Sequence, residues 1–284
     1  MRFGTRRHDL NYPPIRTITS EEIETFARDG VVCLRQFFDS ETVALLRDMA
    51  EENTRNPSPM AVDASREGTG RFFGDTFVWA HHPPLEEFVW QSPAADMAGA
   101  ILQSKKVNVI FDQFLIKNPG TSTRTLWHHD QTYWPVAGDK VATMWIALDP
   151  VTNETGAVEY IKGSHKWGKR YKAVSFKDQD LYKEDLPDVP DIDATRDQYE
   201  FVQYEMEPGD CTLHHGLTLH GAPGNSSLSQ IRRAYIVRWA GDDVTYYPRP
   251  NLQPMLRDPG IQPGDPLDCD LFPVVRGGAE HDAS

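Results

Sequence analysis

The sequence predicts a mainly β protein, a sandwich or barrel of strands with flanking helices packed outside it. Two observations predict this class. Apolar residues recur with a helical period over the first hundred positions, and from residue 107 onward the period changes to two. The strand candidates then follow one another with turn residues between them. With 284 residues, the chain is long enough to bury one substantial core.

We expect a single domain over residues 1–284, in three parts. Residues 1–105 are predicted to be mostly helical, and residues 106–245 to form the barrel with an acidic insert at 172–198. Residues 246–284 are rich in Gly, Pro and Asp, which predicts an irregular tail.

Two helices of the first part begin at recognisable caps. Thr19 and Glu22 form a capping box, and Gly30 suits the position just after a helix end. Asp39 or Ser40 caps a second helix that runs to about residue 53. The other elements predicted here are a strand at 31–34, a loop rich in Gly, Pro and Ser at 54–82, and a helix at about 93–103.

The strands of the second part are predicted by alternating apolar residues. The longest covers 107–117 and is closed by Asn118-Pro119-Gly120. Further candidates are 141–148, 157–161, 201–207, 211–214 and 231–240, with the stretch around His220 between the last two.

Composition narrows the functional class. Forty-two acidic against 29 basic residues give a net charge of −13, which disfavours general binding to nucleic acid or anionic membranes. No apolar run approaches a membrane span, and the N-terminus lacks the pattern of a secretory signal. The three cysteines are far apart, which indicates reduced thiols. We expect a cytoplasmic protein with a small-molecule substrate; the oligomeric state is not indicated.

A metal site is predicted by His128, Asp130 and His220. Side chains two apart on a strand share a face, so His128 and Asp130 project together while His129 projects to the other side. If His220 closes the set from a neighbouring strand, two imidazoles and one carboxylate meet on one face of a metal. Such a set, with the other positions open, suits non-haem Fe(II) and oxygen chemistry.

An arginine pair follows twelve residues after His220. Arg232 and Arg233 open an apolar strand, and one guanidinium there can hold a carboxylate by two parallel hydrogen bonds. A dicarboxylate that chelates iron at one end and meets the arginine at the other has the shape of 2-oxoglutarate. Because the two side chains point to opposite faces, only one can reach the site.

The sequence resembles the phytanoyl-CoA dioxygenase family of Fe(II)- and 2-oxoglutarate-dependent oxygenases over most of its length. The matching motifs are QFLIK at 113–117 with Pro119-Gly120, WHHDQTYWP at 127–135, MWIALD at 144–149, Gly156-Ala157 with Gly163-Ser164-His165, Gly209-Asp210 leading to His215 and His220-Gly221, and Asn225 to Arg232-Arg233-Ala234.

The resemblance implies a double-stranded β-helix, also called a jelly-roll or cupin-like barrel, with His128, Asp130 and His220 as iron ligands. It favours Arg232 as the partner of the distal carboxylate of 2-oxoglutarate, and it places Gln113 and Trp145 along the co-substrate pocket. These residues have competitors. The competing histidines are His129, His214 and His215, of which the resemblance makes His215 structural; Arg233 competes with Arg232, and Trp145 could belong to the core.

The activity implied is hydroxylation of an unactivated C–H bond in a small organic metabolite, with O2 consumed and succinate and CO2 released. Desaturation, epimerisation or cyclisation at the same iron site remain alternatives, and a cupin-like module that binds a metal or ligand without turnover is a third. Because Asp130 is a carboxylate, halogenation is not expected. The sequence does not identify the substrate, and it shows no cluster of Lys and Arg for the phosphates of an acyl-CoA.

Overall fold

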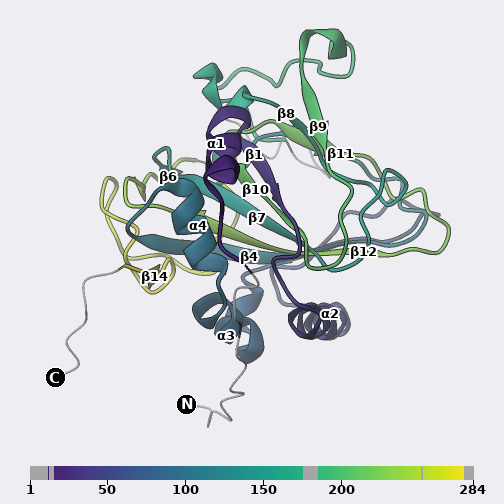
Figure 1. The fold of residues 1–284 in the computed structure, drawn as a ribbon, viewed down its shortest axis with the longest axis horizontal. Helices are drawn as coiled ribbons and strands as arrows, with labels where there is room; N and C mark the ends of the chain where they lie inside the picture. The colour runs from purple at the N-terminus through teal and green to yellow at the C-terminus, as the bar shows by residue number, and fades with distance from the viewer. Residues whose placement is uncertain (1–11, 13–15, 175–184, 251, 278–284) are drawn as a thin grey trace.

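Two antiparallel sheets face each other in the computed structural model, which describes residues 12, 16–174, 185–250 and 252–277 (Figure 1). The larger sheet has the order β1-β10-β7-β12-β4-β3-β2, with β14 also paired to β4. The smaller sheet has the order β5-β11-β8-β9, and β13 and β6 form a separate pair. This arrangement is the predicted double-stranded β-helix, although hydrogen bonds do not close the two sheets into one barrel.

The helices are α1 (Ser20–Asp29), α2 (Ser40–Arg55), α3 (Pro83–Gln91) and α4 (Ala94–Leu102), with four short 3-10 helices at Val78–Ala80, Asp130–Tyr133, Ser164–Trp167 and Arg196–Gln198. The strands are β1 (Val31–Leu34), β2 (Val62–Asp63), β3 (Phe72–Thr76), β4 (Val107–Lys117), β5 (Thr125–His128), β6 (Val136–Ala137), β7 (Val141–Ala147), β8 (Glu159–Ile161), β9 (Phe201–Gln203), β10 (Cys211–His215), β11 (His220–Ala222), β12 (Arg232–Ala240), β13 (Thr245–Tyr246) and β14 (Val274–Arg276). In the part of the chain that these elements cover, no helix is long and apolar enough to cross a membrane.

Both predicted helix starts are confirmed. The Thr19 hydroxyl accepts the backbone N–H of Glu22 at 3.2 Å, and the Glu22 carboxylate accepts the N–H of Thr19 at 2.8 Å. The Asp39 carboxylate accepts the N–H of Thr42 at 2.8 Å and caps α2. Gly30 ends α1 with a φ of 77°, the left-handed conformation that glycine adopts without a steric penalty.

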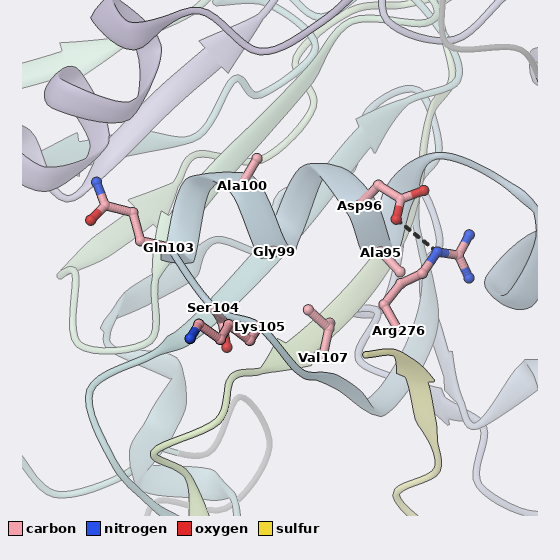
Figure 2. A pocket seen from close by; sticks show the side chains of 9 residues that line it. All are labelled: Ala95, Asp96, Gly99, Ala100, Gln103, Ser104, Lys105, Val107 and Arg276. Carbon is pink, nitrogen blue, oxygen red and sulfur yellow. Dashed lines mark hydrogen bonds and ion pairs between the residues drawn. The ribbon is translucent and has the colours of Figure 1, made fainter. Parts of the chain in front are cut away.

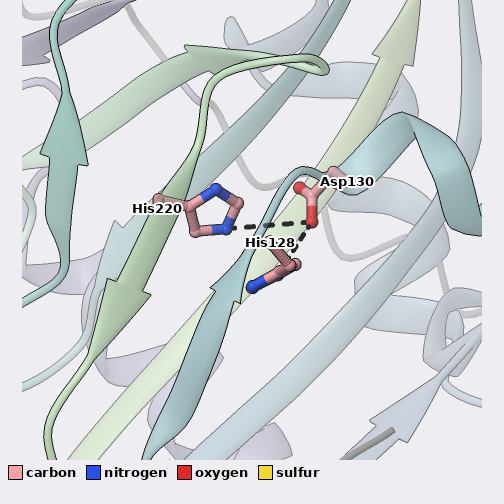
Figure 3. A group of neighbouring side chains, drawn as sticks. All are labelled: His128, Asp130 and His220. Carbon is pink, nitrogen blue, oxygen red and sulfur yellow. Dashed lines mark ion pairs between the residues drawn. The ribbon is translucent and has the colours of Figure 1, made fainter. Parts of the chain in front are cut away.

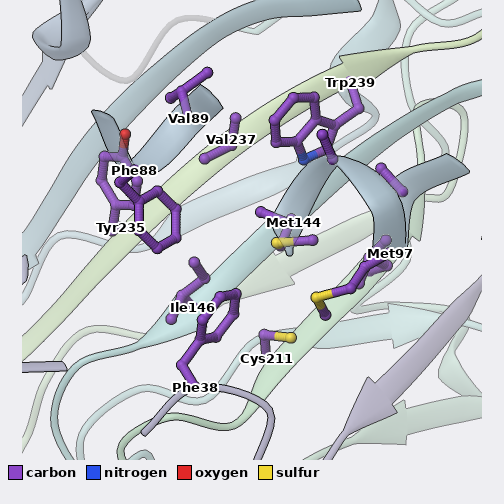
Figure 4. Packing of buried hydrophobic residues seen from close by; sticks show 14 of the residues in the cluster. Phe38, Phe88, Val89, Met97, Met144, Ile146, Cys211, Tyr235, Val237 and Trp239 are labelled. Carbon is purple, nitrogen blue, oxygen red and sulfur yellow. The ribbon is translucent and has the colours of Figure 1, made fainter. Parts of the chain in front are cut away.

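The two faces of the larger sheet have different chemistry. On β12, Tyr235, Val237 and Trp239 point toward the helices, where they join the largest apolar cluster with residues of α3 and α4 (Figure 4). Alternation turns the other side chains of β12, including Arg232 and Arg238, toward the smaller sheet. The outer face therefore supplies the core, and the inner face carries buried polar groups between the sheets.

Three segments differ from the sequence-based predictions. The predicted loop at 54–82 contains β2 and β3, helix α3 was not predicted, and the predicted irregular tail contributes β14. Strand β3 has the sequence FFGDT, which lacks apolar alternation because all five residues are buried. Its pairing with β4 is a tertiary contact that no local pattern reports. The predicted insert at 172–198 lies partly outside the described residues.

A buried carboxyl group on the outer face should make stability depend on pH. The Tyr235 hydroxyl donates to Asp112 at 2.6 Å, and the backbone N–H of Trp79 donates to it at 2.9 Å. Burial nevertheless raises the pKa of Asp112 from 3.8 to about 7. The folded state therefore holds this proton more tightly than the unfolded chain does.

The free energy of unfolding should consequently fall as pH rises from about 4 to about 7, and this contribution should be flat above that window. The Asp112→Asn variant should lose this part of the dependence, measured as the difference between urea unfolding midpoints of the two proteins across pH. Parallel midpoint curves for wild type and variant would contradict the assignment.

Candidate metal centre

The three predicted ligands come together between the sheets. His128 ends β5 and lies directly opposite His220 of β11 in the strand register, with ring centroids 4.2 Å apart. The Oδ1 atom of Asp130 lies 3.5 Å from His128 Nε2 and 3.8 Å from His220 Nε2. Figure 3 shows both rings turned toward this carboxylate. One ligand atom from each residue falls within 4.8 Å of the others, and all three side chains are buried.

The backbone that carries Asp130 differs in one respect from the prediction. Strand β5 stops at His128, and Asp130 begins a 3-10 helix instead of continuing the strand. His129 between them is still extended, with φ −124° and ψ 145°, so the alternation of side chains holds for this step. The His129 ring faces away and accepts the backbone N–H of Tyr171 at 2.9 Å.

Hydrogen bonds fix the tautomers of both histidines. Nδ1 of His128 lies 2.7 Å from the carbonyl oxygen of Leu126, and Nδ1 of His220 lies 2.9 Å from that of Thr218. Because a carbonyl only accepts, each Nδ1 carries the hydrogen and each Nε2 presents a lone pair toward Asp130. Burial lowers the pKa of His220 well below its usual range, which keeps the ring neutral. Neutral Nε2 donors are the form of histidine that binds metals.

Asp130 is held as a carboxylate with one free oxygen. Its Oδ2 accepts the Thr143 hydroxyl at 2.6 Å and lies 3.2 Å from His214 Nε2, whereas Oδ1 faces the two ligand histidines. Burial alone would raise the pKa of Asp130, but the surrounding imidazoles of His128, His214 and His220 bring it well below the usual range. Two imidazole nitrogens and one carboxylate oxygen are a donor set that fits Fe(II).

His214 is a site residue that the sequence reading did not assign. Alternation along β10 places His214 on the inner face beside Thr143, its partner in β7, and turns His215 outward. There His215 accepts the backbone N–H of Leu217 at 3.0 Å, a structural contact. In the sequence, His214 shares a strand face with Thr212, but this alternation does not tell which face of the strand points toward the metal triad.

Thr143 should tune the metal affinity through Asp130. Replacing it by valine keeps the shape of the side chain but removes the hydroxyl that donates to Oδ2. We expect the affinity for Fe(II) or Ni(II) to fall by about 10- to 100-fold, as is typical when a partner of a metal ligand is lost. Calorimetric titration of the metal would measure this. Thr143→Ser is the control that should bind like wild type, and unchanged affinity in the valine variant would refute the role.

Arg232 and Arg233 have opposite environments. The Arg233 guanidinium is paired with both oxygens of Asp149 at 2.8 Å and with Glu51 at 2.8 Å. Arg232 is fully buried and donates from Nη1 to the carbonyl oxygen of Gly156 at 2.5 Å. Its Nε and Nη2 find no acceptor among the described residues. These two atoms form one edge of the guanidinium, the edge that binds a carboxylate with two parallel hydrogen bonds.

The surroundings of Arg232 favour an anion. Its guanidinium lies over the Trp145 ring, 5.4 Å from the ring centroid, and burial lowers its pKa to about 10, so it remains charged at neutral pH. Lys117, opposite Arg232 in the register, is also buried and donates to the carbonyl oxygen of Pro223 at 2.6 Å. Burial lowers the pKa of Lys117 well below its usual range. The sequence reading did not identify Lys117.

Gln113 and Trp145 flank Ile236, one on each side in the register of the sheet. Both therefore lie on the inner face of the larger sheet, between the register positions of Arg232 and Arg238, and their predicted contact with the co-substrate stays a prediction. Trp145 also packs in a small apolar cluster with Ala234 and Ile236, so it contributes to the core as well. The carboxamide oxygen of Gln113 accepts Nη2 of Arg238 at 2.6 Å.

A separate hollow of about 350 Å³ lies beside α4 (Figure 2). Asp96 and Arg276, which both line it, are joined by a contact of 2.7 Å. None of the predicted site residues lines this hollow, so it does not belong to the metal centre.

Comparison with known proteins agrees with this geometry. A family model described as Phytanoyl-CoA dioxygenase (PhyH) matches residues 26–234. Phytanoyl-CoA dioxygenase 1 of Oryza sativa subsp. japonica is 24% identical over 257 residues, which cover 78% of this chain and 88% of the relative.

Two solved structures share the fold. The carbocyclase SnoK from nogalamycin biosynthesis superimposes with a TM-score of 0.73 at 24% identity, over 93% of this chain and 98% of its own. The epimerase SnoN, solved in complex with Fe3+, alpha ketoglutarate and nogalamycin RO, superimposes with a TM-score of 0.71 at 21% identity, over 90% and 98%. Because the family model spans most of the sequence, the chain belongs to the phytanoyl-CoA dioxygenase family and is a non-haem iron, 2-oxoglutarate-dependent dioxygenase.

Proposed function

We propose that this chain binds Fe(II) through His128, Asp130 and His220 and oxidises a small organic substrate while converting 2-oxoglutarate to succinate and CO2. One observation carries the proposal. The buried triad presents two imidazole nitrogens and one carboxylate oxygen between the sheets, and the inner face of the larger sheet holds a buried guanidinium whose Nε and Nη2 have no acceptor among the described residues. A metal ion would bind the triad, and one carboxylate of a dicarboxylate would accept the free hydrogen bonds of the guanidinium.

Arg232 is assigned to the distal carboxylate of 2-oxoglutarate. Its free Nε and Nη2 edge supplies two parallel charge-assisted hydrogen bonds, and Trp145 packs against the guanidinium. Gln113 and Trp145 line the path between this arginine and the metal ligands. Arg233 lies on the opposite face of β12, and its guanidinium is already paired with Asp149 and Glu51. Both observations support the choice of Arg232.

The protein's own residues would orient the metal ligands and exclude water from the site. Iron with 2-oxoglutarate and O2, when bound, supplies the oxidising power. Thr143 and His214 hold the Asp130 carboxylate in one orientation, and the backbone carbonyls of Leu126 and Thr218 orient the two imidazoles. The apolar residues that pack around Trp145 would keep water away from the co-substrate side of the site.

Hydroxylation of an unactivated C–H bond is the proposed outcome. The alternative is epimerisation or cyclisation at the same centre, and it is favoured by the shared fold with an epimerase and a carbocyclase. We propose the cytoplasm as the location, consistent with three free cysteines in the structure.

The test is consumption of 2-oxoglutarate by the purified full chain with Fe(II), ascorbate and O2. Slow succinate formation without substrate is expected. A panel of small metabolites should then contain one that accelerates succinate formation, with the product identified by mass. One added oxygen indicates hydroxylation, and an unchanged mass or a loss of two hydrogens indicates the alternative. Absence of succinate under all conditions would leave a binding module without turnover.

A further inference from the structure

A second buried arginine lies beside the metal ligands. Arg238 is on the same face of β12 as Arg232 and is paired in register with Thr143, whose hydroxyl holds Asp130. Only 7% of its surface is exposed. Its guanidinium lies 4.6 Å from the Phe111 ring centroid and 5.9 Å from that of Trp134. Arg238 is therefore at the metal end of the inner face, and Arg232 is toward the other end.

The guanidinium of Arg238 is incompletely satisfied. Nη2 donates to the carboxamide oxygen of Gln113 at 2.6 Å, while Nε and Nη1 find no acceptor within the described ranges. No carboxylate there forms an ion pair with it. A buried charge without a partner is costly, so a fold retains one where a ligand completes it.

The polar atoms that remain free on Arg238 and on its partner Gln113 are hydrogen-bond donors. Because guanidinium only donates, it fixes the Gln113 carboxamide with its oxygen toward Arg238, which leaves the two N–H bonds of Nε2 for another acceptor. Arg238 Nε and Nη1 have no acceptor among the described residues, and Gln113 Nε2 is a donor by its chemistry, so these three atoms can offer hydrogen bonds but accept none. A ligand for this group must supply acceptors, and the positive charge selects an anion.

A count of the charges at the proposed metal centre gives a second reason to expect an anionic ligand at Arg238. In the proposed complex, the two positive charges of iron and the one of Arg232 are balanced by Asp130 and the two carboxylates of 2-oxoglutarate. The negative groups that act on Arg238 over a distance are Asp130, which is a metal ligand, and Asp112, which is bonded to Tyr235 on the other face. Among the described residues, the positive charge of Arg238 beside the metal triad therefore stays uncompensated.

We propose that Arg238, with the carboxamide N–H of Gln113, binds a carboxylate of the primary substrate. This inference rests on the proposed function and names its substrate class as a carboxylic acid. The flanking rings of Phe111 and Trp134 favour a carboxylate attached to an apolar or aromatic skeleton. The other source of the same chemistry is the metal-proximal carboxylate of 2-oxoglutarate, and the experiment separates the two.

The first measurement needs no metal. Arg238→Met removes an unsatisfied buried charge and keeps an apolar stem of similar length, so the melting temperature of the metal-free protein should rise by about 2–4 °C. Arg233→Met is the matched control, because its guanidinium is paired with Asp149 and its loss should lower the melting temperature. A fall in the Arg238 variant similar to that of the control would show a structural role and overturn the proposal.

The second measurement uses benzoate as the carboxylate probe and neutral benzamide as its match. Calorimetry on the full chain loaded with Ni(II) and 2-oxoglutarate should show benzoate binding more tightly than benzamide. Arg238→Met should weaken benzoate by at least about 10-fold, and Arg238→Lys by less, while the Kd of 2-oxoglutarate should stay within about threefold.

Three outcomes would overturn the proposal: no benzoate binding to wild type, equal binding by Arg238→Met, or a loss of 2-oxoglutarate affinity of 10-fold or more in that variant. The last would assign Arg238 to the co-substrate. If wild type binds no 2-oxoglutarate with Ni(II), the proposed function fails instead, and the benzoate comparison on metal-free protein still decides whether Arg238 binds a carboxylate.

Discussion

Asp130→Ala is expected to lower 2-oxoglutarate-dependent succinate formation by about three orders of magnitude. The reason is that Asp130 supplies the only carboxylate oxygen of the triad and its Oδ1 faces both histidines. Without it, only the two imidazoles remain, and a metal bound there would lack a charged ligand. Metal content after dialysis and succinate release with added Fe(II) and ascorbate would measure the two losses separately.

Asp139→Ala is the matched control for this experiment. Asp139 is a nearby carboxylate whose side chain is 90% exposed and whose contact is with the outward-facing His215 at 3.4 Å. The Asp139→Ala variant should bind metal and release succinate like wild type. Turnover in Asp130→Ala at the wild-type rate, in protein with a native circular dichroism spectrum, would refute the metal assignment.

The second large effect is a crossed pair of substitutions at neighbouring arginines. Arg232→Met should weaken 2-oxoglutarate binding by roughly 100-fold, about 3 kcal/mol, because it removes the bidentate edge that receives the distal carboxylate. Arg233→Met should leave that affinity within about twofold. Calorimetry with Ni(II)-loaded protein gives both values without turnover.

The free energy of unfolding should show the reverse order of the two variants, with the larger loss in Arg233→Met. Arg233→Met breaks a bidentate contact with Asp149, a residue only 6% exposed, and should cost about 2–3 kcal/mol of unfolding free energy. Arg232→Met removes a buried charge that lacks full hydrogen bonding and should leave stability equal or higher. If both variants lost affinity equally, the register that assigns one face to each arginine would be wrong.

Strand alternation, a local rule, could pair His128 with Asp130, whereas the family resemblance was needed to add His220 to the proposed ligands. Alternation separated His128 from His129, and the cap residues Thr19 and Asp39 located two helices. The same rule separated Arg232 from Arg233, but which of them faces inward came from the family resemblance and, independently, from the ion pairs of Arg233.

The residues that were missed depend on tertiary pairing. His214 becomes important because β10 pairs with β7 and brings it beside Asp130, and Lys117 because β4 pairs with β12. Strand β3 forms because β4 offers a free edge, since its own sequence has no periodic signal. Such pairings set the polar surroundings of the centre and cannot be derived from one segment alone.

The register that places His128 opposite His220 joins residues 92 positions apart, from 128 to 220. Contacts of such separation close a long loop, so they tend to form late in folding. The three side chains are therefore brought together only when β5 and β11 have paired, and neither segment alone carries the proposed metal site.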